Sequence, residues 1–338
     1  MKEEHRSTAA ATAVTVVAGG ADAERLVAQL AWDIAAHEGP GSVAVVSETD
    51  PQPASSVATR VGVRWITAPA VEGTRQADCM SSASRLDLVT VMRLLIERPA
   101  PVRHVLVLVA PERSVATVAH TIIAEPELRR LVALDSVCAV VDGSTLSTRL
   151  ALDLPFGSRP ELEALAIADR IVVAGANRLT SAAWDRTARS VRTLNRLGPV
   201  WAPSIRAVGV GGFLGIEAWN GAPAIGPSNA AEALVVDDPD DLPTTIALEC
   251  DSPLDAEACE AWFDELLARD GVRLLRLQGE VAVDGENHLV WCRGIYDFAT
   301  SEAAPRDQAR PNHSRIVVVG HGLCARTVRQ HFEDSIAR

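Results

Sequence analysis

One stretch near the start of the chain constrains its fold more than any other. An apolar, β-branched run, VTVVA, leads directly into the glycine pair Gly19 and Gly20. Leu26, Leu30 and Ile34 then recur at every fourth position, the spacing of a helix that buries one face. A strand, a glycine turn and a helix in this order predict an α/β fold, in which parallel strands alternate with covering helices.

The glycine turn lacks the groups that a phosphate cradle requires. A cradle of the form G-x-x-x-x-G-K-[ST] uses a second glycine for its backbone, a lysine for the phosphates and a hydroxyl for magnesium. After Gly20 the chain reads ADAER, which places two carboxylates where phosphate would lie. Arg25 is a broad planar fork, not a compact ammonium group, and the only lysine of the chain, Lys2, lies in the N-terminal tail. The sequence therefore predicts a turn that does not hold nucleotide phosphates.

Composition excludes some partners. The 338 residues, 48% of them apolar, can bury a sizeable core, and the length suggests two domains. With 44 acidic and 32 basic side chains the net charge is -12, so we expect neither direct nucleic acid binding nor a membrane partner.

The cysteines and the N-terminal segment bear on the location of the protein. The six cysteines are dispersed without a C-x-x-C pair, which favours a location in the reducing cytoplasm. The apolar residues 9–18 imitate a signal peptide, but cleavage after them would remove the first strand.

Apolar periodicity predicts three regions. Residues 9–202 form an α/β domain, residues 203–243 are a glycine- and proline-rich linker, and residues 244–338 form a smaller α+β domain. After the first strand, the expected strands of the first domain are 42–47, 61–66, 102–109, 137–141, 168–174 and 199–201, with a turn at Asp142-Gly143. Those of the second domain are 244–250, 274–277, 280–283, 288–293 and 315–320. After the first helix, the expected helices are 84–97, 114–124, 184–197, 255–268 and 325–336.

Several segments share their order and spacing with those of a known family. They are residues 15–19 leading into the turn, DCMSS at 78–82, the strand 137–142 ending in VVD, AIADRIVV at 166–173, the pair Leu194-Asn195, and the segments 262–279 and 315–320. In these segments the chain resembles the CobW family of P-loop GTPases and metallochaperones over nearly its whole length. The resemblance implies a P-loop-GTPase-like parallel sheet with helices on both faces, followed by a smaller α+β CobW-type C-terminal domain.

The departures from the family pattern fall on its chemistry. The lysine of the phosphate loop is missing, and the guanine motif N-K-x-D is replaced by AGAN, which ends at Asn177 and lacks the carboxylate. The resemblance thus leaves Gly19, Gly20, Arg25 and Asn177 as the positions of a degenerate nucleotide site. Of the metal motif C-x-C-C only Cys79 remains, because serines replace the other two thiolates. We expect no cofactor and no catalytic residue, with zinc or GTP and magnesium as the alternative.

The resemblance also implies a biological setting. This setting is metal homeostasis, chiefly of zinc or cobalt, and for degenerate relatives it includes the zinc-limitation response and ribosome hibernation. We interpret the chain as a cytoplasmic pseudo-GTPase, an inactive GTPase homologue that acts as an adaptor or regulator by binding another protein. That protein would be a metalloprotein, a ribosome-associated factor or an active relative. The alternative is a GTP-binding metallochaperone whose nucleotide and metal contacts have been rewired.

Overall fold

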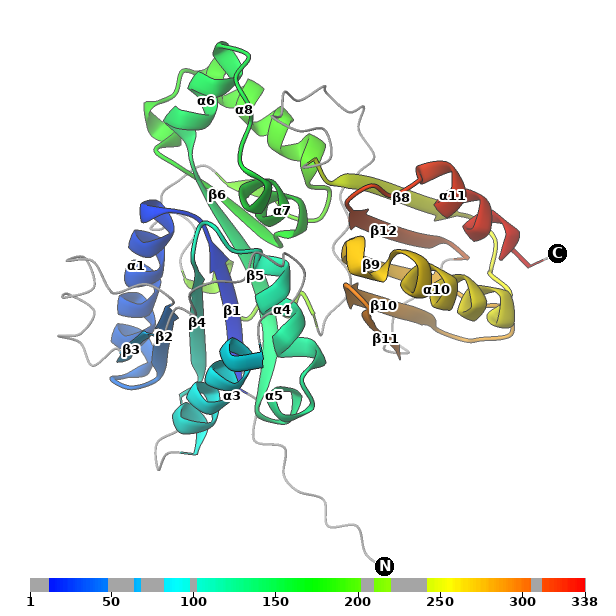
Figure 1. Cartoon of the computed structure of the whole chain (residues 1–338), viewed down its shortest axis with the longest axis horizontal. Helices are drawn as coiled ribbons and strands as arrows, with labels where there is room; N and C mark the ends of the chain where they lie inside the picture. The colour runs from blue at the N-terminus through cyan, green and yellow to red at the C-terminus, as the bar shows by residue number, and fades with distance from the viewer. Residues whose placement is uncertain are drawn as a thin grey trace, which may run out of the picture.

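The computed structural model describes residues 12–47, 64–67, 82–97, 102–201, 210–219, 242–304 and 312–337. Within these residues the chain forms a seven-stranded sheet and a five-stranded sheet. Figure 1 shows the larger sheet with its helices on the left and the smaller sheet on the right. The predicted fold class, a parallel sheet with helices on both faces followed by a smaller α+β unit, is confirmed.

The first sheet is parallel throughout and has the strand order β3-β2-β4-β1-β5-β6-β7. Its strands are β1 (Thr12–Ala18), β2 (Val43–Ser47), β3 (Arg64–Thr67), β4 (His104–Val109), β5 (Val132–Asp142), β6 (Arg170–Ala174) and β7 (Val200–Trp201). Because the carboxyl ends of parallel strands meet at one edge, the loops that follow β1, β4, β5 and β6 lie together. Ligands of open α/β sheets bind at this edge.

Helices cover both faces of the first sheet. They are α1 (Ala21–Glu38), α3 (Ser82–Ile96), α4 (Val115–Ala124), α5 (Pro126–Leu131), α6 (Gly143–Ala151), α7 (Arg159–Ile167) and α8 (Ser181–Leu194), with short 3₁₀ turns η1 (Ala176–Arg178) and η2 (Val210–Gly212). On one face α1 packs with Phe213 and Leu214 against one set of alternate strand residues. On the opposite face α3, α4, α7 and α8 pack against the other set. Successive side chains of each buried strand point to opposite faces of the sheet and so contribute to two separate apolar layers.

The second sheet is antiparallel and has the order β11-β10-β9-β12-β8. Its elements are β8 (Thr244–Cys250), α10 (Ala256–Asp270), η4 (Gly271–Arg273), β9 (Leu274–Ala282), β10 (Leu289–Ile295), β11 (Phe298–Ala303), β12 (Ser314–Gly320) and α11 (Ala325–Asp334). One face packs on α10 and α11 through residues such as Leu277 and Val318. From the other face, Leu275, Val317 and Val319 join the apolar cluster of the first unit. The two sheets therefore share one core across α4 and α7.

Residues 210–219 are anchored to the first sheet. The carboxylate of Asp135 on β5 accepts hydrogen bonds from the amides of Gly215 (3.1 Å) and Glu217 (2.8 Å). Burial raises the pKa of Asp135, and these amide contacts partly oppose that effect. Phe213 and Trp219 are buried in the two apolar layers. The predicted division of the chain into residues 9–202, 203–243 and 244–338 stays a prediction.

Several predicted elements were wrong in detail. The expected turn at Asp142-Gly143 is the start of α6, because the Asp142 carboxylate accepts the Thr145 amide at 2.6 Å and caps that helix. The separate strands expected at 274–277 and 280–283 are one strand, β9. Gly279 at its centre faces β12 so closely that a Cβ atom would lie 2.5 Å from the carbonyl oxygen of Arg315. This glycine marks a close backbone approach and not a turn.

Other elements were not predicted at all. The helices α5, α6 and α7 and the strand β11 had no counterpart in the periodicity, and β5 begins five residues before the strand expected at Val137. Polar Asp135 and Ser136 interrupt the apolar run there, although both side chains are buried. None of the helices in the described ranges is long and apolar enough to cross a membrane.

Candidate functional site

A cavity of about 380 Å³ lies at the carboxyl edge of β1 and β5. Its walls come from the turn before α1, the end of β5, the helix α6 and the first turns of α7. The lining residues are Gly20, Ala21, Asp22, Arg25, Val140, Val141, Asp142, Thr145, Leu146, Arg149, Phe156, Glu161 and Leu165. A ligand of this sheet would be expected at this edge, so the cavity is the candidate site.

The turn into α1 keeps the geometry of a tight strand-to-helix connection. Gly19 has φ +143°, and a Cβ atom there would lie 2.4 Å from the carbonyl oxygen of Val140. Only glycine fits this position. Gly20 is the N-cap of α1, and its carbonyl accepts the amide of Ala23 at 2.9 Å. The backbone of the turn is therefore preserved even though the side chains that would hold phosphate are absent.

The chain supplies its own negative charge at the start of α1. Asp22 and Glu24 both lie in the first turn of this helix, where the aligned backbone amides favour an anion. Arg25 donates to the Asp22 carboxylate at 2.6 Å, so the guanidinium group that lines the cavity already has a carboxylate partner. A phosphate group that binds here would have to displace a carboxylate of the chain before it could contact the first amides of α1 or the guanidinium group of Arg25.

The arginine of the opposite wall also has partners within the chain. Arg149 donates to the carbonyl oxygen of Phe156 at 3.2 Å and lies 3.6 Å from the carboxylate of Glu161. Asp142 is committed to the start of α6, and its hydrogen bond from the Thr145 amide lowers the pKa of the carboxyl group. The cavity thus carries three carboxylates against two guanidinium groups, both of them paired. Both guanidinium groups that line the cavity therefore already contact groups of the chain itself.

The structure brings together only some of the predicted site residues. Gly20 and Arg25 line the cavity and Gly19 precedes them, whereas Asn177 is exposed on η1 and is not part of the lining. Cys79 lies outside the described residues. Within the described ranges no group of three or more histidine, cysteine, aspartate or glutamate side chains could hold a metal ion. The assignment of these five residues stays a prediction.

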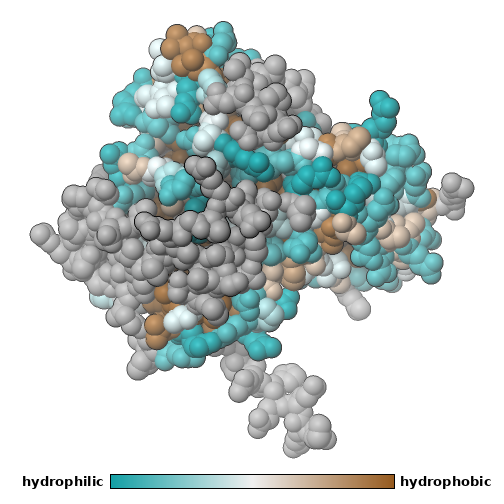
Figure 2. Space-filling model, viewed as in Figure 1, coloured by the Kyte–Doolittle hydropathy of each residue, from teal (hydrophilic) through white to brown (hydrophobic). Residues whose placement is uncertain are grey.

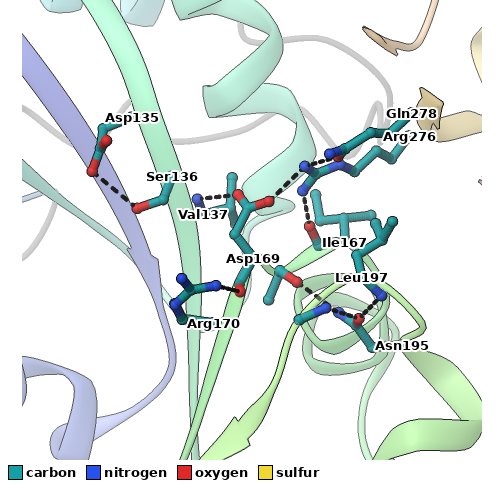
Figure 3. Close-up of polar contacts among 12 residues, drawn as sticks. Asp135, Ser136, Val137, Ile167, Asp169, Arg170, Asn195, Leu197, Arg276 and Gln278 are labelled. Carbon is teal, nitrogen blue, oxygen red and sulfur yellow. Dashed lines mark hydrogen bonds and ion pairs between the residues drawn. The ribbon is translucent and has the colours of Figure 1, made fainter. Parts of the chain in front are cut away.

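Sequence analysis missed a buried ion pair that joins the two sheets (Figure 3). Arg276 of β9 is fully buried and donates to the carboxylate of Asp169 at 2.6 Å. The same guanidinium group donates to the carbonyl oxygen of Ile167 and to the side chain of Gln278, and it stacks on the ring of Trp219 at 4.5 Å. Asp169 also accepts the backbone amide of Val137 at 2.8 Å, which ties β5 to the same network.

Asn195 has a comparable structural role. Its side-chain amide donates to the carbonyl oxygens of Leu165 (2.6 Å) and Ala168 (2.8 Å), and its side-chain oxygen accepts the amides of Leu197 (2.6 Å) and Gly198 (2.7 Å). Figure 3 shows this residue beside the Asp169 network. The segments 166–173 and 194–195, on which the family resemblance was based, thus hold the ends of α7 and α8 together.

A second polar contact joins the two units beside the loop that follows β4. Glu163 of α7 and His321 after β12 are both buried and lie 3.0 Å apart. Burial opposes ionisation of Glu163, but hydrogen bonds from His321, Ser114 and Arg159 outweigh it and lower the pKa of the carboxyl group. The Tyr296 hydroxyl lies 3.3 Å from that of Ser114. The loop after β4 is therefore packed against the second sheet.

Comparison with known proteins supports this architecture. Residues 244–336 match the family described as the cobalamin synthesis protein CobW C-terminal domain. The chain superposes on the Zn(II)-bound YjiA GTPase from E. coli with a TM-score of 0.69 at 17% identity, covering 97% of this chain and 99% of that chain. A Zn(II)-bound triple mutant of YjiA GTPase gives a TM-score of 0.70 at 15% identity, with the same coverage. No curated protein sequence matches the chain significantly.

The described residues share the fold of the YjiA GTPase, a parallel sheet covered by helices and followed by a smaller antiparallel sheet, and the residues of the turn before α1 include no lysine. The predicted resemblance to the CobW family is confirmed by the match of residues 244–336 and by the shared fold.

Proposed function

We propose that the chain is a CobW-like pseudo-GTPase that acts by binding another protein, in the setting of zinc or other metal homeostasis. One observation supports the first part of this proposal: each guanidinium group of the cavity already contacts a carboxylate of the chain itself. Arg25 is bound to Asp22, and Arg149 contacts Glu161 and the carbonyl oxygen of Phe156. Phosphoryl transfer depends on positioned amides, a lysine and magnesium, and the cavity offers no lysine and a surplus of carboxylates.

The second part follows from what remains when the nucleotide contacts are removed. The two sheets share one apolar core, and the tight turn at Gly19 is formed. The fold is therefore intact although the side chains that would bind a nucleotide are missing. A stable scaffold without catalytic groups can still function by presenting surfaces to a partner. A metalloprotein, a ribosome-associated factor or an active relative are the partners that the family setting suggests.

The rival candidate is a GTP-binding metallochaperone with rewired contacts, and the open volume of the cavity is the observation that favours it. About 380 Å³ remains open at the edge of the sheet where a ligand would bind. The Zn(II)-bound GTPase with a similar fold is consistent with this alternative. In the rival function, Arg25 or Arg149 would exchange its internal carboxylate for phosphate.

Thermal unfolding with and without nucleotide separates the two candidates. At a GTP concentration of about 100 times the dissociation constant, a bound nucleotide stabilises the folded chain by about 2.7 kcal/mol, which raises the unfolding temperature by several degrees. We expect no shift with about 1 mM GTP and magnesium, because the site is predicted to bind more weakly than that concentration. A shift of several degrees that disappears in Arg25→Ala or Arg149→Ala would establish the rival.

A further inference from the structure

Two exposed helix faces of opposite charge lie on the two units of this chain. Helix α8 exposes Arg186, Arg189 and Arg192, which we name the arginine face. Helix α10 exposes Glu257, Glu260 and Asp264, which we name the acidic face. The arginine face is notable because the whole chain has a net charge of -12, so copies that approach at random repel one another.

The arginine face follows from the spacing along α8. Its three arginines recur every third residue, while Thr187, Val191 and Leu194 turn the other side of the helix into the core. Asp185 is the one acidic residue of this helix. Arg186 and Arg192 form no ion pair with any residue in the described part of the chain. A side of the helix with excess positive charge therefore faces solvent.

The acidic face is built in the same way on the second unit. Trp262 and Leu266 of α10 pack on the second sheet, which leaves the three carboxylates on the outer side of the helix. These carboxylates form no ion pair within the ranges that the structure describes. In Figure 2 the part of the molecule that carries α10 and α11 is largely hydrophilic. The two faces belong to helices that cover different sheets.

The two faces also match in length. The outer arginines are six positions apart and the outer carboxylates seven, and at 1.5 Å per residue these spans are about 9 Å and about 10.5 Å. Three cations can thus be placed opposite three anions by two helices packed side by side. Leu152 and Leu154 are exposed just after α6, which packs against α8, and they add apolar surface to the same unit.

We propose that copies of this chain associate head to tail, with the arginine face of one copy against the acidic face of the next. Such a contact uses different surfaces on the two partners, so it leaves one face free at each end and forms either a closed ring or a growing chain. Complementary charge selects this register over others and is weakened by salt. The inference is independent of the state of the cavity and of the function proposed above.

Analytical ultracentrifugation of the full chain, with two reciprocal variants, tests the proposal. The first variant combines Arg186→Glu, Arg189→Glu and Arg192→Glu, and the second combines Glu257→Arg, Glu260→Arg and Asp264→Arg. Wild type is expected to gain mass with concentration in about 0.02 M salt and to be monomeric at about 1 M, where the screening length falls from about 20 Å to about 3 Å. Each variant alone should associate at least about tenfold more weakly, since like charges then face one another.

The decisive sample is an equal mixture of the two variants. In one of its contacts the charges are exchanged, and in the other they are those of the wild type, so the mixture should regain association. Arg326→Glu with Arg329→Glu, which reverses exposed arginines of α11, is the matched control and should behave as wild type. All substitutions are at exposed positions, and unchanged circular dichroism spectra show that the variants are folded. A wild type that stays monomeric at low salt, or a mixture that fails to associate when wild type does, overturns the proposal.

Discussion

Arg276 and Asp169, which lie 107 positions apart in the sequence, form a buried ion pair 2.6 Å long between the second sheet and the end of α7. Both side chains are at most 5% exposed, so their charges are compensated by protein groups and not by water. This pair, together with the shared apolar cluster, fixes the orientation of the second sheet relative to the first.

We predict that breaking this pair strongly destabilises the chain. Arg276→Ala leaves the Asp169 carboxylate buried without its main partner. Asp169→Ala leaves the Arg276 guanidinium group buried without its carboxylate partner. Each change should cost about 3 to 5 kcal/mol of unfolding free energy, measured in urea. The double variant should cost much less than the sum of the two.

The exposed arginine Arg103, which lies 3.9 Å from Glu38, provides the control. Arg103→Ala should change the unfolding free energy by less than about 1 kcal/mol. Equal losses for Arg276→Ala and Arg103→Ala would contradict a structural role for the buried pair.

Asn195 gives a second prediction on stability. Asn195→Ala removes four short hydrogen bonds and leaves two amides and two carbonyl groups without a side-chain partner. We expect a loss of about 3 kcal/mol or more in the unfolding free energy. Asn177→Ala, at an exposed position of the other predicted motif, should stay within about 0.5 kcal/mol of wild type. If both variants unfold like wild type, Asn195 does not hold α7 and α8 together.

The lowered pKa of Glu163 predicts a pH dependence of stability. A carboxyl group whose pKa is lower in the folded than in the unfolded chain stabilises the fold above its unfolded value of about 4.3, and this contribution is lost as pH falls through the folded value. Glu163→Gln should therefore be less stable than wild type at pH 7, and the difference should shrink below about pH 4. Unfolding free energies across this range measure it. Glu257→Gln, at an exposed site of α10, should show no comparable change, and a constant difference for Glu163→Gln would refute the linkage.

A further prediction concerns metal. One thiolate at Cys79 with two neighbouring serines falls short of the four-ligand shell that zinc prefers, so we expect no stoichiometric zinc or cobalt bound through this segment. The measurement is metal content after expression in zinc-rich medium, for wild type and Cys79→Ala. About one zinc per chain that is lost in the variant would show that other side chains complete a site.

The sequence allowed the fold class to be predicted because apolar periodicity is a local property. β1, the turn at Gly19 and α1 all follow from neighbouring residues. The misses at β5 and β9 have a different origin, since Asp135 and Gly279 are buried by contacts with distant segments that no local pattern reveals. The same holds for Arg276 and His321, whose partners Asp169 and Glu163 lie more than 100 positions away.

The candidate site was only partly predictable for a related reason. The absence of a lysine and the presence of Asp22 could be read directly from the residues around the turn. That Arg149 lies beside Glu161 in one wall of the cavity depends on how α6 and α7 pack, and neither helix was predicted. The pairing of the cavity's cations, on which the proposed function depends, became visible only in the structure.

Isothermal titration calorimetry with GTP and magnesium tests the central claim most directly. Losing a charge-assisted contact costs about 2 to 5 kcal/mol, and the phosphate lysine, the magnesium hydroxyl and the guanine carboxylate are all missing here. A micromolar site near about -8.2 kcal/mol should therefore weaken beyond about millimolar, and we predict no saturable heat. A dissociation constant below about 10 μM would contradict the pseudo-GTPase account and restore the nucleotide-binding alternative.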